Sequence, residues 1–207
     1  TAFTSNIQKG GALLDDARRL VEVWDLDHDA SWNLTRIAEQ NLLAKRSRAR
    51  ADDVLLRVLG PRLVEPGPHV IETLKRLLPW PRAFVEAYYF EATRDDALLA
   101  TFAEGPLYAW WEQGRIGVEV EQVLTWLADL AREGEIPSWS DTIQVKVARG
   151  LLAAMRDFGI LTGAVRKEFA SPSLSLAGFG YTAFRLHEVG ASSRALIESP
   201  VWRRWLL

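Results

Sequence analysis

The chain has 207 residues, of which 48% are hydrophobic and 25% are charged, and its formal net charge is −2. It contains no cysteine, which excludes disulfide frameworks, thiolate zinc sites and cysteine nucleophiles. No apolar run approaches the roughly 20 residues that a membrane-spanning helix needs, so we expect a cytoplasmic protein with no membrane partner.

Hydrophobic periodicity predicts three helices before residue 60. Their expected ranges are 12–26, 32–44 and 49–59. Ser47 is a candidate N-cap for the third helix, because a serine oxygen accepts hydrogen bonds from free backbone N–H groups. Gly60 and Pro61 are expected to end this helix.

Prolines then divide the chain into short helical segments. The expected ranges are 69–78, 82–91, 94–103 and 107–113. Longer amphipathic helices are expected over 117–132 and from Ser140 or Asp141 to Phe158, where Gly159 suits the position after a helix end. The pattern predicts a mainly α fold, a compact stack of short helices with helix-turn-helix-like units.

The pattern changes after Gly159. Residues 160–169 favour strand at both ends and Gly163 suits a turn, which predicts a small β-wing near 160–170. A helix over 174–188 and two short helices flanking Pro200 complete the chain. We expect either an N-terminal helix-turn-helix-like region, 1–63, followed by a region with the winged-helix-like element, 64–207, or a single domain.

Basic residues gather between the second and third expected helices. The residues of this turn are Lys45, Arg46, Ser47, Arg48 and Arg50, and residues 36–62 carry a net charge of +4. Helix, basic turn and helix is the layout of a DNA-binding helix-turn-helix unit. The alternative is a solvated loop between charged helix ends.

A second basic group lies in the last third of the chain. Lys146, Arg149 and Arg156 have helical spacings of three and seven, so they share one face, and Arg166 and Lys167 follow in the expected wing. A basic helix followed by a basic hairpin is what a winged helix presents to DNA. An ordinary exposed helix face is the alternative. If both basic groups bind DNA, we expect them to converge into one positive surface.

No residue pattern predicts catalysis or a cofactor. Asp25, Asp27 and Asp29 match the first acidic positions of a calcium loop, but Arg36 stands where the bidentate glutamate belongs. This segment therefore favours a surface loop. The chain has no phosphate-binding glycine loop and no nucleophile elbow. We expect a protein that is not an enzyme, with neither metal nor cofactor.

Tryptophan is abundant, with nine residues. Large rings supply much of the buried area in a stack of short helices, so most should be core. Trp202 and Trp205 flank Arg203 and Arg204 near the end of the sequence, and we predict either a contact with a partner protein there or a clamp formed by this end of the chain.

Several segments resemble the BrxA family. They are SNIQKGGALL (5–14), NLLAKRS (41–47) followed by Arg62-Leu63, SDTI (140–143) followed by Lys146, and Leu151-Leu152 followed by DFGIL (157–161). The resemblance implies a small helical subunit of BREX, a bacterial and archaeal phage defence, whose members are associated with DNA binding. It transfers no catalytic motif. The inner-membrane label that some members carry has no support in this sequence.

Three functional hypotheses follow. The first is a non-enzymatic accessory protein that binds double-stranded DNA, with other BREX proteins as further partners. The second is an adaptor that holds a larger defence complex through the acidic middle of the chain, residues 86–138, which carry 11 acidic and 3 basic residues, and through exposed tryptophans. The third is an RNA-binding helical protein.

Overall fold

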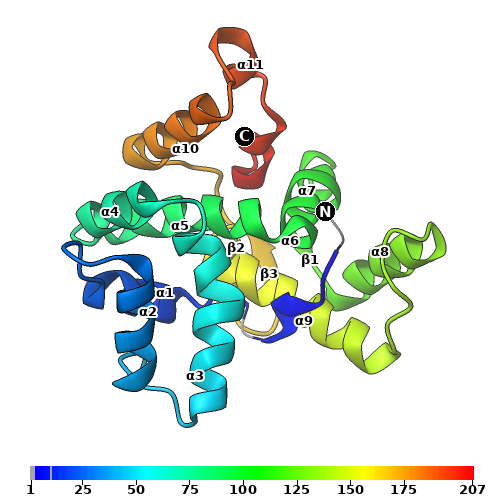
Figure 1. The fold of residues 1–207 in the computed structure, drawn as a ribbon. Helices are drawn as coiled ribbons and strands as arrows, with labels where there is room; N and C mark the ends of the chain where they lie inside the picture. Colours follow the sequence, from blue (N-terminus) through cyan, green and yellow to red (C-terminus); the bar gives the residue numbers. More distant parts are fainter. Residues whose placement is uncertain (1–2, 10) are drawn as a thin grey trace. The chain divides into compact units, whose positions relative to one another are not determined.

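The computed structural model describes residues 3–9 and 11–207, which are mainly helical with one small three-stranded antiparallel sheet (Figure 1). The predicted mainly α fold with a small β element is confirmed. Backbone contacts divide the chain into two compact units. We call Leu13–Glu91 the first unit, and Thr1–Ala12 together with Ala92–Leu207 the second unit. Within the described residues, no helix combines the length and the apolarity that crossing a bilayer requires.

The first unit is entirely helical. Its elements are α1 (Leu14–Val23), α2 (Ala30–Glu39), α3 (Arg48–Val54), η2 (Leu55–Val64), α4 (Pro68–Leu77) and most of α5 (Pro81–Asp95). Each helix turns an apolar stripe inward, as with Leu20 and Val21 of α1 and Ile71 and Leu74 of α4, which are buried. Ser47 is the N-cap of α3, since its hydroxyl accepts from the Arg50 backbone N–H at 3.2 Å.

The prediction that Gly60 and Pro61 end the third helix is wrong. The helix continues to Val64 as the π-helix η2, in which Glu65 N–H donates to the Gly60 carbonyl at 3.0 Å. A π-helix pairs residue i with i−5, and this wider turn accommodates a proline ring that would clash in an α-helix. Gly60 also helps, because a Cβ there would lie 3.2 Å from the Leu55 carbonyl oxygen.

The second unit holds the remaining elements. They are η1 (Asn6–Lys9), α6 (Ala97–Phe102), η3 (Ala103–Leu107), α7 (Tyr108–Glu112), β1 (Gly117–Val118), α8 (Val120–Arg132), α9 (Asp141–Asp157), β2 (Leu161–Thr162), β3 (Lys167–Phe169), α10 (Leu176–Glu188), α11 (Ser193–Ile197) and η4 (Pro200–Trp205). The helix continues through Pro106 from α6 to α7, again by a π-helical turn, η3. The expected break there is therefore absent.

Strand β1 was not predicted, because residues 117–132 were expected to form one helix. Gly117 and Val118 instead pair with Glu168 and Lys167 of β3. The pairing requires glycine, since a Cβ on Gly117 would lie 2.2 Å from the Lys167 carbonyl oxygen. Helix α8 then begins with a capping box, in which the Glu119 N–H donates to the Gln122 side chain at 2.8 Å.

The end of α9 and the hairpin follow the prediction. Gly159 has a left-handed φ of 78° directly after the helix, and Gly163 has a φ of 86° in the turn between β2 and β3. The sheet order is β1-β3-β2, with all neighbours antiparallel. A small wing therefore follows α9 at the predicted place.

Candidate nucleic-acid interface

One face of α9 is open to solvent and basic. The opposite side packs into the second unit through Val147, Leu151 and Met155, which are fully buried. Element η1 covers a further side so closely that a Cβ on Gly150 would lie 2.8 Å from the Ile7 carbonyl oxygen. The remaining side carries the predicted set of Lys146, Arg149 and Arg156, all exposed.

The hairpin that follows α9 has a slender tip. The side chain of Val165 is 99% exposed, and Ala164 and Arg166 beside it are also exposed. Lys167 is different, because it is only 8% exposed and its ammonium donates to the carbonyls of Gly163, at 2.8 Å, and Ala164. Burial lowers the pKa of Lys167, and the nearby Arg156 lowers it further. Lys167 thus holds the turn together from inside.

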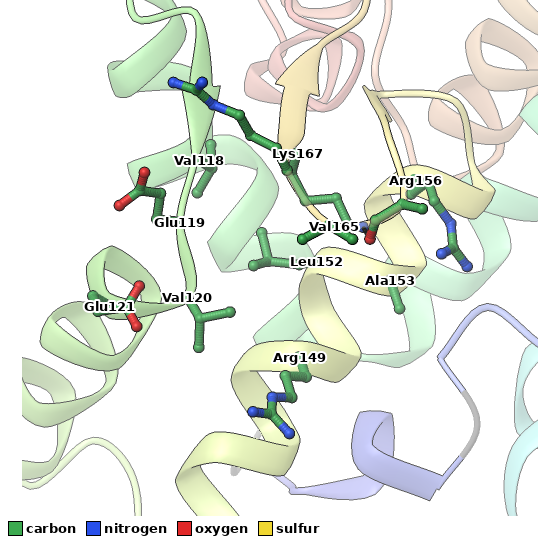
Figure 2. A pocket seen from close by; sticks show the side chains of 12 residues that line it. Val118, Glu119, Val120, Glu121, Arg149, Leu152, Ala153, Arg156, Val165 and Lys167 are labelled. Carbon is green, nitrogen blue, oxygen red and sulfur yellow. Dashed lines mark hydrogen bonds between the residues drawn. The ribbon is translucent and has the colours of Figure 1, made fainter.

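A hollow of about 630 Å³ separates α9 from the hairpin tip (Figure 2). Arg149 and Arg156 line its α9 side, and Arg166 lines the hairpin side. Its third side is the segment from Val118 to Glu121, which includes two acidic residues. The remaining lining is Lys167 and the apolar side chains of Val118, Val120, Leu152, Ala153, Ala164 and Val165.

Ion pairs separate the basic residues of this face into two kinds. Arg156 is occupied, since its guanidinium donates twice to the Asp157 carboxylate, at 3.0 and 2.6 Å. The side chains of Lys146, Arg149 and Arg166 have no hydrogen bond or ion pair with any described residue. Arg149 and Arg166, which line the hollow, and Lys146, which is exposed on α9, are therefore available to an external anion.

The basic turn at residues 45–50 belongs to the first unit. Lys45 forms an ion pair with Asp16, and Arg50 forms one with Asp53 at 3.3 Å. The Ser47 hydroxyl caps α3. Arg46 and Arg48 are exposed, and their side chains have no partner in the part of the chain that the structure describes. The convergence of this turn with the α9 face stays a prediction.

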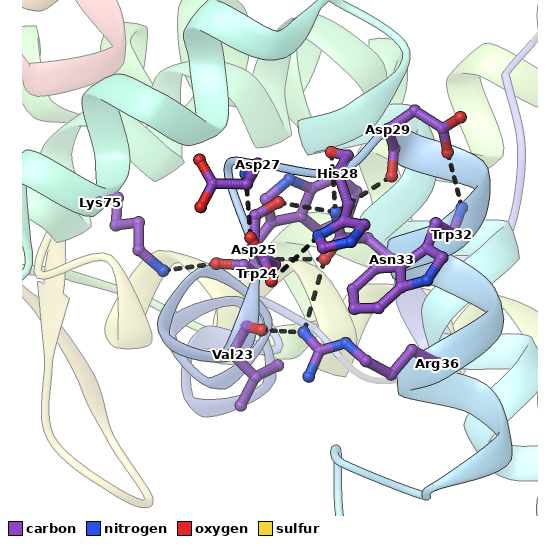
Figure 3. A network of polar contacts seen from close by, with 10 residues as sticks. All are labelled: Val23, Trp24, Asp25, Asp27, His28, Asp29, Trp32, Asn33, Arg36 and Lys75. Atoms are coloured by element: carbon purple, nitrogen blue, oxygen red, sulfur yellow. Dashed lines mark hydrogen bonds and ion pairs between the residues drawn. The ribbon is translucent and has the colours of Figure 1, made fainter.

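The acidic loop at residues 25–29 is organised by Asn33 (Figure 3). The Asn33 side chain, which is completely buried, accepts from the Asp25 N–H at 2.8 Å and donates to the carbonyls of Asp25, His28 and Asp29 at 2.8 to 3.2 Å. The Asp27 N–H donates to the Asp25 carboxylate and lowers the pKa of Asp25. In residues 3–9 and 11–207, no group of three or more His, Asp or Glu residues could hold a metal.

The two C-terminal tryptophans differ in exposure. Trp205 is 3% exposed and lies in the interior of the second unit. Trp202 is half-buried, stacks on Phe179 with ring centroids 5.1 Å apart, and donates its indole N–H to the Leu196 carbonyl at 2.7 Å. It borders an apolar hollow of about 550 Å³ that Ile197 and Leu207 also line. Of the pair, Trp202 is the residue that an external protein can reach.

The sequence analysis did not identify Val165 at the hairpin tip or Asn33 in the acidic loop as important residues. An apolar β-branched residue between Ala164 and Arg166, inside a turn, was the available signal for Val165. No sequence signal distinguishes Asn33, because an asparagine within a helix is usually exposed.

Comparisons with known proteins give one family and one fold. The sequence profile described as BrxA matches residues 1–181. The solved structure of an uncharacterised protein from Magnetospirillum magneticum is similar, with a TM-score of 0.73 and 19% sequence identity over 99% of this chain and 98% of that one. At that identity the likeness concerns the fold alone. No curated protein matches the sequence.

Proposed function

Because this chain belongs to the BrxA family, we propose that it is a non-enzymatic accessory protein of a BREX-type phage-defence system and that it binds double-stranded DNA. The family supplies the defence context. The DNA-binding part of the proposal rests on residues of this chain. The observation that carries it is that Lys146 and Arg149 of α9 and Arg166 of the hairpin are exposed and have no ion-pair partner among the described residues.

The order of elements in the second unit supports this proposal. Strand β1, helices α8 and α9, and the hairpin β2–β3 follow one another, and the sheet has the order β1-β3-β2. A winged-helix module has this order, and its second helix is the one that enters the DNA. In this chain that helix is α9, so the exposed face of Lys146 and Arg149 is the face that approaches the duplex.

Helix α9 has the dimensions and side chains for the major groove. That groove is about 12 Å wide and admits one helix. Recognition helices contact base edges mainly through their N-terminal part. Lys146 lies in the N-terminal half of α9 and Arg149 at its midpoint. Arginine donates two parallel hydrogen bonds to guanine or to a phosphate. Arg149 is therefore the best candidate for a base contact, while Arg156, already paired with Asp157, suits phosphate.

The test measures binding of the purified protein to short duplex DNA, single-stranded DNA and duplex RNA of one sequence. Fluorescence anisotropy of the labelled nucleic acid reports the binding. We expect tightest binding to duplex DNA, with an affinity that falls steeply with salt, since each neutralised phosphate adds about 0.9 to the log–log slope. Tighter binding to RNA would support the RNA-binding alternative instead. No salt-dependent binding to any of the three would leave the adaptor function, for which the hollow beside Trp202 is the candidate surface.

The basic turn of the first unit is the second candidate contact. Arg46 and Arg48 are exposed and pair with no residue that the structure describes. The double substitution Arg46→Ala and Arg48→Ala should therefore weaken duplex binding by about tenfold and to the same degree for every sequence. Anisotropy titrations with two unrelated duplexes measure this. Substitution of the ion-paired Lys45 and Arg50 by alanine is the matched control for charge. Unchanged affinity in the Arg46/Arg48 variant would remove this turn from the interface.

A further inference from the structure

We infer that the hairpin tip, residues 163–166, enters the minor groove of the bound duplex, and that Val165 and Arg166 there make the protein prefer A·T-rich DNA. The inference rests on the proposed function and deepens it, because it assigns sequence discrimination to residues outside α9. Four observations carry it: the width of the tip, its rigidity, its side chains, and the hollow between it and α9.

The tip is narrow enough for the minor groove, which is about 6 Å wide in B-DNA. The turn begins with Gly163, whose φ of 86° favours glycine. A Cβ on Gly163 would also lie 2.0 Å from the Arg166 carbonyl oxygen, so the two ends of the turn approach closely. Ala164 adds only a methyl group. The chain thus reverses with little bulk at its outermost point.

The tip is held in one shape before any contact is made. The ammonium of Lys167 bonds the carbonyls of both Gly163 and Ala164 from the inner side of the hairpin, and β2 and β3 pair directly behind the turn. A turn that is already ordered loses less conformational entropy on binding. Lys167 therefore positions the tip and is not itself expected to contact DNA.

The exposed side chains suit the minor groove of A·T pairs. Val165 is 99% exposed, and such an apolar side chain gains by leaving water for the floor of a groove. Guanine places an N2 amino group in this groove, which Val165 cannot satisfy with a hydrogen bond. Arg166 has no partner among residues 3–9 and 11–207, and its charge is attracted by the strong negative potential of narrow A·T-rich grooves.

The hollow explains how the tip and α9 contact one duplex together. When a helix lies in the major groove and a hairpin lies in the adjacent minor groove, one sugar–phosphate strand passes between them. The hollow of about 630 Å³ has this position (Figure 2). Its apolar lining, including Leu152 and Ala153, suits deoxyribose, and Arg156 in the same lining suits the phosphate.

Duplexes that contain inosine show whether the protein distinguishes base pairs through the minor groove or through the major groove. An I·C pair presents the major groove of G·C but lacks the guanine N2 amino group, so its minor groove resembles that of A·T. We expect the wild-type protein to bind a duplex of A·T pairs and one of I·C pairs about tenfold more tightly than one of G·C pairs. The double substitution Val165→Ala and Arg166→Ala should reduce this preference to less than about twofold.

The control and the outcomes keep the two proposals separate. Arg132→Ala removes an exposed arginine of the same unit that is paired with Asp129, and it should leave the preference unchanged. If the wild-type protein binds all three duplexes equally, or treats I·C like G·C, the minor-groove assignment is overturned while duplex binding stands. If no duplex is bound, both proposals fail. Circular dichroism of the variants shows that the exposed substitutions leave the fold intact.

Discussion

Replacing Lys146, Arg149 and Arg166 together by alanine should weaken duplex binding by about 100-fold at low salt, if each cation contributes about 1 kcal/mol or slightly more. The three side chains have no partner among the described residues, so their removal leaves no uncompensated carboxylate inside the protein. The log–log salt slope should also fall by about 0.9 for each of the three cations that neutralises a phosphate, and so by at most about 2.7. Anisotropy titrations between about 50 and 200 mM salt measure both quantities.

The matched control removes three other exposed arginines of the second unit. Arg115 lies over the Trp110 ring, Arg132 pairs with Asp129 and Arg194 pairs with Glu198. Their joint substitution by alanine changes the net charge by the same amount, but none of the three lines the hollow between α9 and the hairpin. We expect a loss of no more than about threefold. Equal losses in the two triple variants would show that net charge alone, and not the α9 face, drives binding.

Local signals in the sequence were sufficient to predict helix α9 and the hairpin that follows it. The apolar stripe of α9 and the left-handed glycines, Gly159 and Gly163, act within a few residues of where they stand. Turn and cap chemistry of this kind is readable without knowledge of the rest of the chain. The predicted wing and the exposed face of α9 depended only on such signals.

Strand β1 depended on a distant partner and was missed for that reason. Its two residues, Gly117 and Val118, are extended because they pair with β3, about 50 positions later in the chain. The sequence instead shows an amphipathic pattern that continues backwards from α8. The π-helical turn at Pro61 is a similar case, because burial of Leu59 and Leu63 on one continuous helix outweighs the local tendency of Gly-Pro to break it.

The sequence also could not predict which basic side chains form ion pairs within the protein. Lys45 and Arg46 are neighbours, yet Lys45 pairs with Asp16 of α1, while Arg46 has no partner in the described part of the chain. Likewise Lys167 serves the turn of the hairpin while Arg166 next to it faces solvent. A count of charges gives the sign of a segment. Only the tertiary structure shows which of those charges are neutralised internally.

Asn33→Ala should lower the free energy of unfolding by about 3 kcal/mol, because it leaves buried backbone groups without partners at about 1 to 3 kcal/mol each. The Asn33 amide bonds both the N–H and the carbonyl of Asp25 and also bonds the carbonyls of His28 and Asp29 (Figure 3). No apolar substitute can make these contacts, and water reaches a fully buried position poorly. Urea unfolding followed by circular dichroism measures the change.

Asn41→Gly separates burial from the mere loss of hydrogen bonds. Asn41 also fixes a loop, since its side chain exchanges hydrogen bonds with the backbone N–H and carbonyl of Lys45, both at 2.9 Å. It is exposed, however, so water replaces both partners, and glycine tolerates its left-handed φ of 46°. We expect a cost below about 1 kcal/mol. If Asn33→Ala cost no more than Asn41→Gly, the acidic loop would fold without the amide, and the packing of α1 and α2 alone would have to hold it.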